Sequence, residues 1–122
     1  MENKQLTAKK SDDGNGALSR LVIKKGNTYH IVKTKKIHWL ESDGNYVRIY
    51  SNGQKYLLRA TLKGLLQKLD NTEFQQIHRS TVVNIEFIQK IKKTMYGEFI
   101  VILKNGEELK MSRSYTDLLE SI

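Results

Sequence analysis

Short apolar runs separated by polar turn residues fill the chain from about residue 20 onward. An Asp-Gly pair at 43–44 and Asn-Gly pairs at 52–53 and 105–106 lie between such runs. These pairs are the strongest short signals of a β-hairpin, because both turn positions tolerate positive φ. The run at 99–103 is apolar on both faces, which favours a strand inside a sheet. The pattern predicts antiparallel hairpins over 21–32, 37–58 and 98–111.

Two segments follow the spacing of a helix instead. The leucines of 62–69 recur at i, i+3, i+4 and i+7, and Thr61 precedes them as an expected cap. The stretch 115–122 repeats this spacing, and Ser114 with Asp117 resembles a capping box. The sequence therefore predicts a mainly β fold of small antiparallel sheets built from hairpins, with two short helices.

Residues 1–19 differ from the rest of the chain. They are polar and have too little apolar surface to offset the entropy of ordering. We expect 1–19 to be a disordered tail or linker and 20–122 to form one domain with a real core. No apolar run approaches the roughly 18 residues of a membrane span, and no signal peptide is evident. The absence of cysteine excludes disulfides and suits a cytoplasmic protein.

Charge narrows the choice of partner. The chain has 21 Lys and Arg against 13 Asp and Glu, a net charge of +8 at pH 7, and a pI near 9.7. Residues 21–60 hold eight basic and two acidic side chains, whereas residues 96–122 hold three and five. A basic body indicates a polyanionic partner, of which nucleic acid is the commonest. On charge alone, a surface that only aids solubility explains the excess equally well.

The stretch 74–88, FQQIHRSTVVNIEFI, holds a basic centre between apolar anchors. Reading a base edge requires a guanidinium on a rigid scaffold, and such anchors supply one for Arg79. A presented arginine donates two bonds to O6 and N7 of guanine, worth about 1–3 kcal/mol of discrimination. The competing interpretation is an ion pair between Arg79 and Glu73 or Glu86.

The neighbours of Arg79 are expected to support it. His78 is expected at the edge of the core, bonded to backbone. Ser80 and Asn84 are expected to tie down the loop, and Ser80 also to reach a phosphate. The three histidines are accompanied by no paired carboxylates, metal-ligand spacing or phosphate-cradling glycine loop. We therefore expect no catalysis, no metal site and no cofactor.

Several motifs, in the same order, resemble the LytTR family of DNA-binding domains. Residues 37–47 (IHWLESDGNYV) and 58–62 (LRATL) look like the first half of that domain. Residues 74–84 (FQQIHRSTVVN) are similar to its central signature, and the Asn-Gly pair at 105–106 with 111–115 (MSRSY) resembles its end. The resemblance covers about residues 21–122, nearly everything outside the tail.

The resemblance implies an output domain of bacterial response regulators, usually C-terminal to a phosphorylated receiver. Such a domain reads the major groove of double-stranded DNA with loop residues, at paired repeats bound by two copies, often with bending. A receiver of roughly 120 residues does not fit into 1–19, so phosphorylation control is expected at most for a longer parent protein.

The implied base contacts fall on three segments. The segment 41–46 (ESDGNY) supplies Asn45 or Tyr46, the segment 78–80 (HRS) supplies Arg79, and the segment 112–114 (SRS) supplies Arg113. The alternatives are a positive-φ turn residue for Asn45 and a solvated arginine at a helix end for Arg113. The expected contacts to the DNA backbone are Ser80, Lys33, Lys35, Lys90, Lys92 and Lys93.

Two other functions are consistent with the sequence. One is a single-strand or RNA-binding β-module that stacks bases on Trp39, Tyr46, Tyr50 or Tyr56. The strand spacing of these residues favours packing among themselves instead. The other is a protein-interaction module whose charge only aids solubility.

Overall fold

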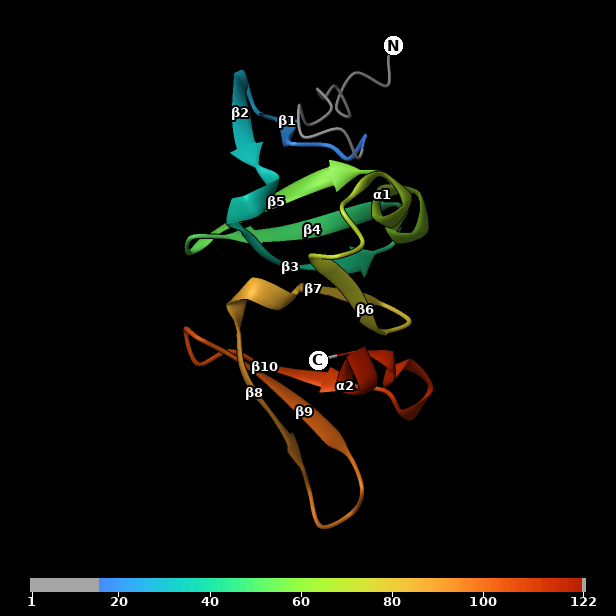
Figure 1. Cartoon of the computed structure of the whole chain (residues 1–122). Helices are drawn as coiled ribbons and strands as arrows, with labels where there is room; N and C mark the ends of the chain where they lie inside the picture. The colour runs from blue at the N-terminus through green and yellow to red at the C-terminus, as the bar shows by residue number, and fades with distance from the viewer. Residues whose placement is uncertain (1–15, 122) are drawn as a thin grey trace.

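The computed structural model describes residues 16–121, so positions 1–15 of the predicted tail and Ile122 lie outside the described residues (Figure 1). The fold is mainly β with two short helices, as predicted. The strands are β1 (Arg20–Lys25), β2 (Thr28–Lys33), β3 (Ile37–Asp43), β4 (Tyr46–Ser51), β5 (Gln54–Arg59), β6 (Phe74–His78), β7 (Thr81–Asn84), β8 (Ile88–Lys93), β9 (Phe99–Leu103) and β10 (Glu108–Met111). The helices are α1 (Leu62–Lys68) and α2 (Asp117–Ser121), and short 3-10 turns are η2 (Thr34–Lys36), η3 (Ile85–Phe87) and η4 (Arg113–Tyr115).

The strands form small antiparallel sheets. A five-stranded sheet has the order β5-β4-β3-β7-β6, a three-stranded sheet has the order β10-β9-β8, and β1 pairs with β2. The predicted hairpins are confirmed, and the apolar run of β9 is the central strand of its sheet as expected. The sequence interpretation treated 78–80 as an anchored loop. His78 is instead the last residue of β6, and only residues 79–80 form the turn of a further hairpin, β6–β7.

The five-stranded sheet is covered on both faces, as the layers of Figure 1 show. On one face, the leucines of α1 and the inner side of the β1–β2 hairpin pack against Leu40, Ile49 and Leu58. On the other face, the three-stranded sheet and Leu118 of α2 pack around Trp39 and other residues of the sheet. The second cluster matters for function because it fixes the C-terminal strands against β3, β6 and β7.

The helices begin differently from each other. Thr61 caps α1 as predicted, since its hydroxyl accepts the backbone N–H of Gly64 at 2.9 Å. The capping box expected at Ser114 does not begin the last helix. Ser112 instead accepts the Ser114 N–H and closes η4, and Thr116 is not helical, so α2 starts only at Asp117. No helix within residues 16–121 is long and apolar enough to cross a membrane.

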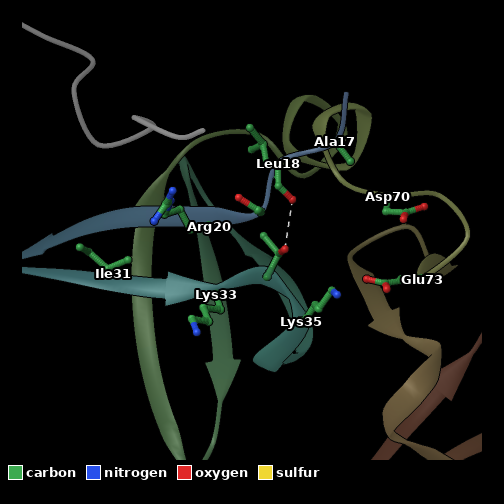
Figure 2. Close-up of a pocket in the computed structure, with 10 residues that line it drawn as sticks. Ala17, Leu18, Arg20, Ile31, Lys33, Lys35, Asp70 and Glu73 are labelled. Carbon is green, nitrogen blue, oxygen red and sulfur yellow. Dashed lines mark hydrogen bonds between the residues drawn. The ribbon is translucent and has the colours of Figure 1, made fainter. Parts of the chain in front are cut away.

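Contacts with the domain begin shortly before residue 20. The Leu18 N–H donates to the Lys68 carbonyl at 2.9 Å, and the Thr34 N–H donates to the Ser19 carbonyl at 3.0 Å. A cleft of about 360 Å³ lies here, with Lys33, Lys35 and Glu73 among its lining residues (Figure 2).

Candidate nucleic-acid interface

Three turns from distant parts of the chain lie along one edge of the molecule. The Ser42 N–H, at the end of β3, donates to the Ser80 carbonyl at 2.9 Å. The Ser112 N–H, just before η4, donates to the Ile77 carbonyl at 2.8 Å. These bonds bring together turn 44–45, turn 79–80 and η4, on the right-hand side of Figure 1. We call this surface the three-turn edge.

Arg79 occupies the central turn of this edge, and its side chain is exposed. Glu73 precedes β6 and Glu86 follows β7, so the antiparallel hairpin places both acids at the end away from the turn. Among residues 16–121, no carboxylate lies within ion-pair distance of the Arg79 guanidinium. The competing interpretation of Arg79 as an ion-pair residue is therefore wrong.

Hydrogen bonds from neighbouring side chains hold the backbone of turn 79–80. The Ser80 N–H donates to His78 Nδ1 at 3.2 Å, and the Ser80 hydroxyl lies 2.9 Å from the same nitrogen. Gln76 Nε2 donates to the carbonyls of His78 and Arg79 at 3.1 and 3.4 Å. His78 is thus bonded to backbone, as predicted, and Ser80 ties down the turn.

Asn84 has a different role from the one expected. Its side chain is 1% exposed, donates from Nδ2 to the Ile37 carbonyl at 2.9 Å, and accepts the Glu86 N–H at 3.0 Å. It therefore joins the end of β7 to the start of β3, remote from Arg79. The sequence interpretation was wrong here because spacing does not show which end of a hairpin a side chain serves.

Turn 44–45 shows how Asn45 and Tyr46, the two candidates for one base contact, differ in their surroundings. Positive φ falls on Gly44, at 61°, so Asn45 is not needed for that conformation. Asn45 stands exposed at the tip of the turn. Tyr46 already belongs to β4 and lies opposite Arg59, whose guanidinium carbon is 5.9 Å from the centre of the tyrosine ring. Both side chains are exposed, and that of Tyr46 lies against Arg59.

Arg113 begins η4 and is tethered to the turn between β8 and β9. Its Nη2 donates to the Tyr96 carbonyl at 3.3 Å. A Cβ atom on Gly97 would lie 3.2 Å from the same nitrogen, and Gly97 has a φ of 81°. Arg113 is exposed but held, unlike the freely solvated arginine of the alternative interpretation.

The predicted lysines are divided between the two ends of the molecule. Lys93 lies opposite Phe99 in the register, at the Arg113 end of β8, with Lys92 beside it and Lys90 nearer the middle of the strand. Lys33 and Lys35 precede β3, whose seven residues separate them from the three-turn edge by roughly 20 Å. The structure does not bring Lys33 and Lys35 to this edge.

The sequence interpretation did not include two basic residues near the three-turn edge among the DNA contacts. Arg59 ends β5 beside Tyr46, and Lys110 lines a hollow with His78 and Arg113. Arg59 stands inside the LRATL motif, which was the available signal. No sequence motif indicated Lys110, because only the pairing of β10 with β9 brings it close to Arg113.

The acidic side chains of β3 near the edge share one arginine. Arg48 pairs with Glu41 at 3.2 Å and with Asp43. The phenol of Tyr50 and the carboxylate of Asp43 raise the pKa of Arg48 above its ordinary value. Arg48 thus offsets one of the two negative charges that would repel phosphate, and it is less available as a contact itself.

Three of the four aromatic residues considered for base stacking pack within the domain, whereas Tyr46 is exposed beside Arg59. Trp39 and Tyr50 stack on each other with ring centres 4.0 Å apart, and Tyr56 packs against His30 and the core. This confirms packing as their role. The three histidines lie on different strands against different partners, and residues 16–121 contain no cluster of three potential metal-ligating side chains.

Comparisons with known proteins agree with this fold. The family model described as LytTr DNA-binding domain matches residues 27–122. The solved LytTr DNA-binding domain of a putative methyl-accepting/DNA response regulator from Bacillus cereus has a TM-score of 0.76 at 22% identity, covering 84% of this chain and 94% of that one.

Curated relatives include the sensory transduction protein LytT of Bacillus subtilis, 29% identical over 84% of this chain, and an uncharacterized response regulatory protein of Vibrio cholerae, 32% identical over 82%. The transcriptional regulatory protein LytR of Staphylococcus aureus is 24% identical over 93% of this chain. The aligned parts are 43%, 40% and 50% of these relatives, so the chain spans about half their length or less.

Proposed function

Because the chain belongs to the LytTR family of DNA-binding domains, we propose that it reads double-stranded DNA with its three-turn edge, in the major groove and without an inserted helix. The observation that carries this proposal is the meeting of turn 44–45, turn 79–80 and η4 along one edge, joined by the bonds at Ser42 and Ser112. Each segment presents an exposed side chain that suits a base edge.

In this proposal Arg79 donates two bonds to guanine and Arg113 reaches a second base. Arg113 uses one guanidinium N–H on the Tyr96 carbonyl and has others to spare. Asn45 pairs with N6 and N7 of adenine. Ser80, Lys92 and Lys93, with Arg59 and Lys110, contact phosphates around the edge.

The whole protein is proposed to be a bacterial transcriptional regulator whose DNA sites are paired repeats bound by two copies. The relatives bear the names of sensory transduction and response regulatory proteins and are longer than this chain. Control by a receiver is therefore proposed only for a longer parent protein. Selection of bound sequences from a random duplex pool tests the function. We expect a short repeated motif, and a pool without enrichment would contradict sequence-specific reading.

The first turn gives a test of its own. Asn45→Ala should weaken binding to the selected site by about 5- to 150-fold, the range of one good bidentate base contact, and relax preference at one adenine position. Tyr46→Phe keeps the ring beneath Arg59 and should leave that preference intact. Affinities for a panel of single-base variants of the site measure both effects. Relaxed preference in Tyr46→Phe alone would assign the contact to Tyr46.

The lysines give a second test, with a matched control. Removing one phosphate contact lowers the slope of log K against log salt by about 0.9. Lys93→Ala should show this reduction on selected and random duplexes alike, because phosphate contacts carry no sequence information. Lys35→Ala removes the same charge from the opposite end and should keep the full slope. Equal slopes for both variants would remove Lys93 from the interface.

A further inference from the structure

The turn between β8 and β9 displays two large apolar side chains that no packing in residues 16–121 explains. Met95 is 89% exposed and Tyr96 is 78% exposed. Both stand at the far end of the β8–β9 hairpin, which projects beyond the rest of the molecule at the bottom of Figure 1.

Hydrogen bonds define the backbone of this turn, and both side chains point outward from it. The Thr94 N–H donates to the Glu98 carbonyl at 2.7 Å, and the Thr94 hydroxyl oxygen accepts the N–H groups of Tyr96 and Glu98. Gly97 supplies the positive φ that the turn requires. Arg113 holds the turn from outside through the Tyr96 carbonyl.

The surroundings of Met95 and Tyr96 indicate the kind of surface they meet. Three cations lie at the turn, since Lys92 and Lys93 lead into it and Arg113 touches it, against one exposed carboxylate, that of Glu98. A second copy of this chain docked here would bring these cations against their own counterparts. Duplex DNA suits this combination, because its phosphates attract the cations and its stacked bases offer an apolar surface to the two side chains.

The tether to Arg113 places the turn relative to the proposed interface. When Arg113 enters a major groove, the Tyr96 carbonyl, 3.3 Å from its Nη2, lies inside that groove or at its border. A turn at the border faces a phosphate strand, and the minor groove lies on the other side of that strand. Apolar side chains such as methionine enter minor grooves as wedges that unstack neighbouring base pairs and bend the duplex.

We propose that Met95 and Tyr96 form a wedge that enters the minor groove next to the groove read by Arg113 and kinks the DNA there. This inference rests on the proposed function and adds a second mode of recognition to it. Pyrimidine–purine steps unstack most readily, so the wedge selects a TA or CA step at a fixed distance from the base contacted by Arg113. Selectivity at that step then arises without a hydrogen bond to it.

The test uses the full 122-residue chain on its selected duplex. The double variant Met95→Ser/Tyr96→Ser removes the wedge, whereas Met95→Leu/Tyr96→Phe keeps an apolar wedge. Tyr29→Ser/Ile31→Ser is the matched control, because these side chains of β2 are 62% and 66% exposed and lie away from the three-turn edge. Bending is measured by energy transfer between dyes at the duplex ends, and unstacking by the fluorescence of 2-aminopurine at the TA or CA step.

We expect the first variant to lose the bend and the 2-aminopurine signal and to bind roughly tenfold more weakly, about the loss of one stacking contact. It should keep its base preference at the Arg113 position. Replacing the TA or CA step by a stiff A-tract should weaken the wild-type protein and leave this variant unchanged. The conservative variant and the β2 control should behave as the wild type.

Two results would overturn the wedge. One is a Met95→Ser/Tyr96→Ser protein that bends and unstacks its site as the wild type does. The other is a variant that still bends a single half-site but loses cooperativity on paired sites, which would assign the turn to contact between copies. A wild-type protein that binds selected and random duplexes alike would instead refute the proposed function itself, and the wedge with it.

Discussion

Arg79→Ala should weaken binding to the selected duplex by about 5- to 150-fold and leave binding to random duplex nearly unchanged. The range corresponds to about 1–3 kcal/mol for a bidentate arginine–guanine contact. The structure supports an effect of this size, because the turn is fastened by His78, Ser80 and Gln76 before DNA arrives. Little of the binding free energy is then spent on ordering the arginine's backbone.

Two variants separate this effect from a simple loss of charge. Arg79→Lys keeps the charge but loses the planar fork, so it should lose specificity almost as far as alanine does. Arg20→Ala removes one exposed positive charge at the start of β1, outside the three-turn edge, and should lower both affinities only slightly. Titrations of selected and random duplex at one salt concentration measure all three. A parallel loss on both duplexes in Arg79→Ala would mean that Arg79 contacts phosphate.

Trp39→Ala should destabilise the domain by about 3–5 kcal/mol, the usual cost of removing a buried tryptophan side chain. Trp39 is 8% exposed, stacks on Tyr50 and packs in the cluster that joins the five-stranded sheet to the C-terminal strands. Domains of this kind have free energies of unfolding of about 5–15 kcal/mol, so the substitution removes a large share of the total stability. Urea unfolding followed by far-ultraviolet circular dichroism measures the change, since Trp39 is the only tryptophan available as a fluorescence probe.

The same substitution tests whether sheet packing positions the interface. Loosening this cluster lets η4 shift relative to turn 79–80, since the Ser112–Ile77 hydrogen bond crosses the same junction. We expect the folded fraction of Trp39→Ala to discriminate poorly at the base assigned to Arg113 and to keep its preference at the Arg79 position. Trp39→Phe retains a ring in the cluster and should cost distinctly less stability. A destabilisation below about 1 kcal/mol in Trp39→Ala would show that the junction repacks around the gap.

The local elements of this protein follow from residue patterns along short segments. Asp-Gly and Asn-Gly pairs fix hairpins because the turn backbone needs their conformational freedom, and leucines at helical spacing with Thr61 before them specify α1. Arg79 was also recognisable, since its apolar anchors are adjacent in sequence. The start of the last helix was not, because Ser112 and Ser114 compete as caps and residue types alone do not decide between them.

Which of these segments act together depends on how the folded chain packs. Turn 44–45, turn 79–80 and η4 become one surface through strand register and through bonds such as Ser42 to Ser80, between residues far apart along the chain. The fold also puts Lys35 at the far end and leaves Lys93 at the end of β8, before the turn that Arg113 contacts. Local patterns report what each short segment prefers, whereas the relative positions of segments depend on which faces bury each other, and that is a property of the whole packed chain.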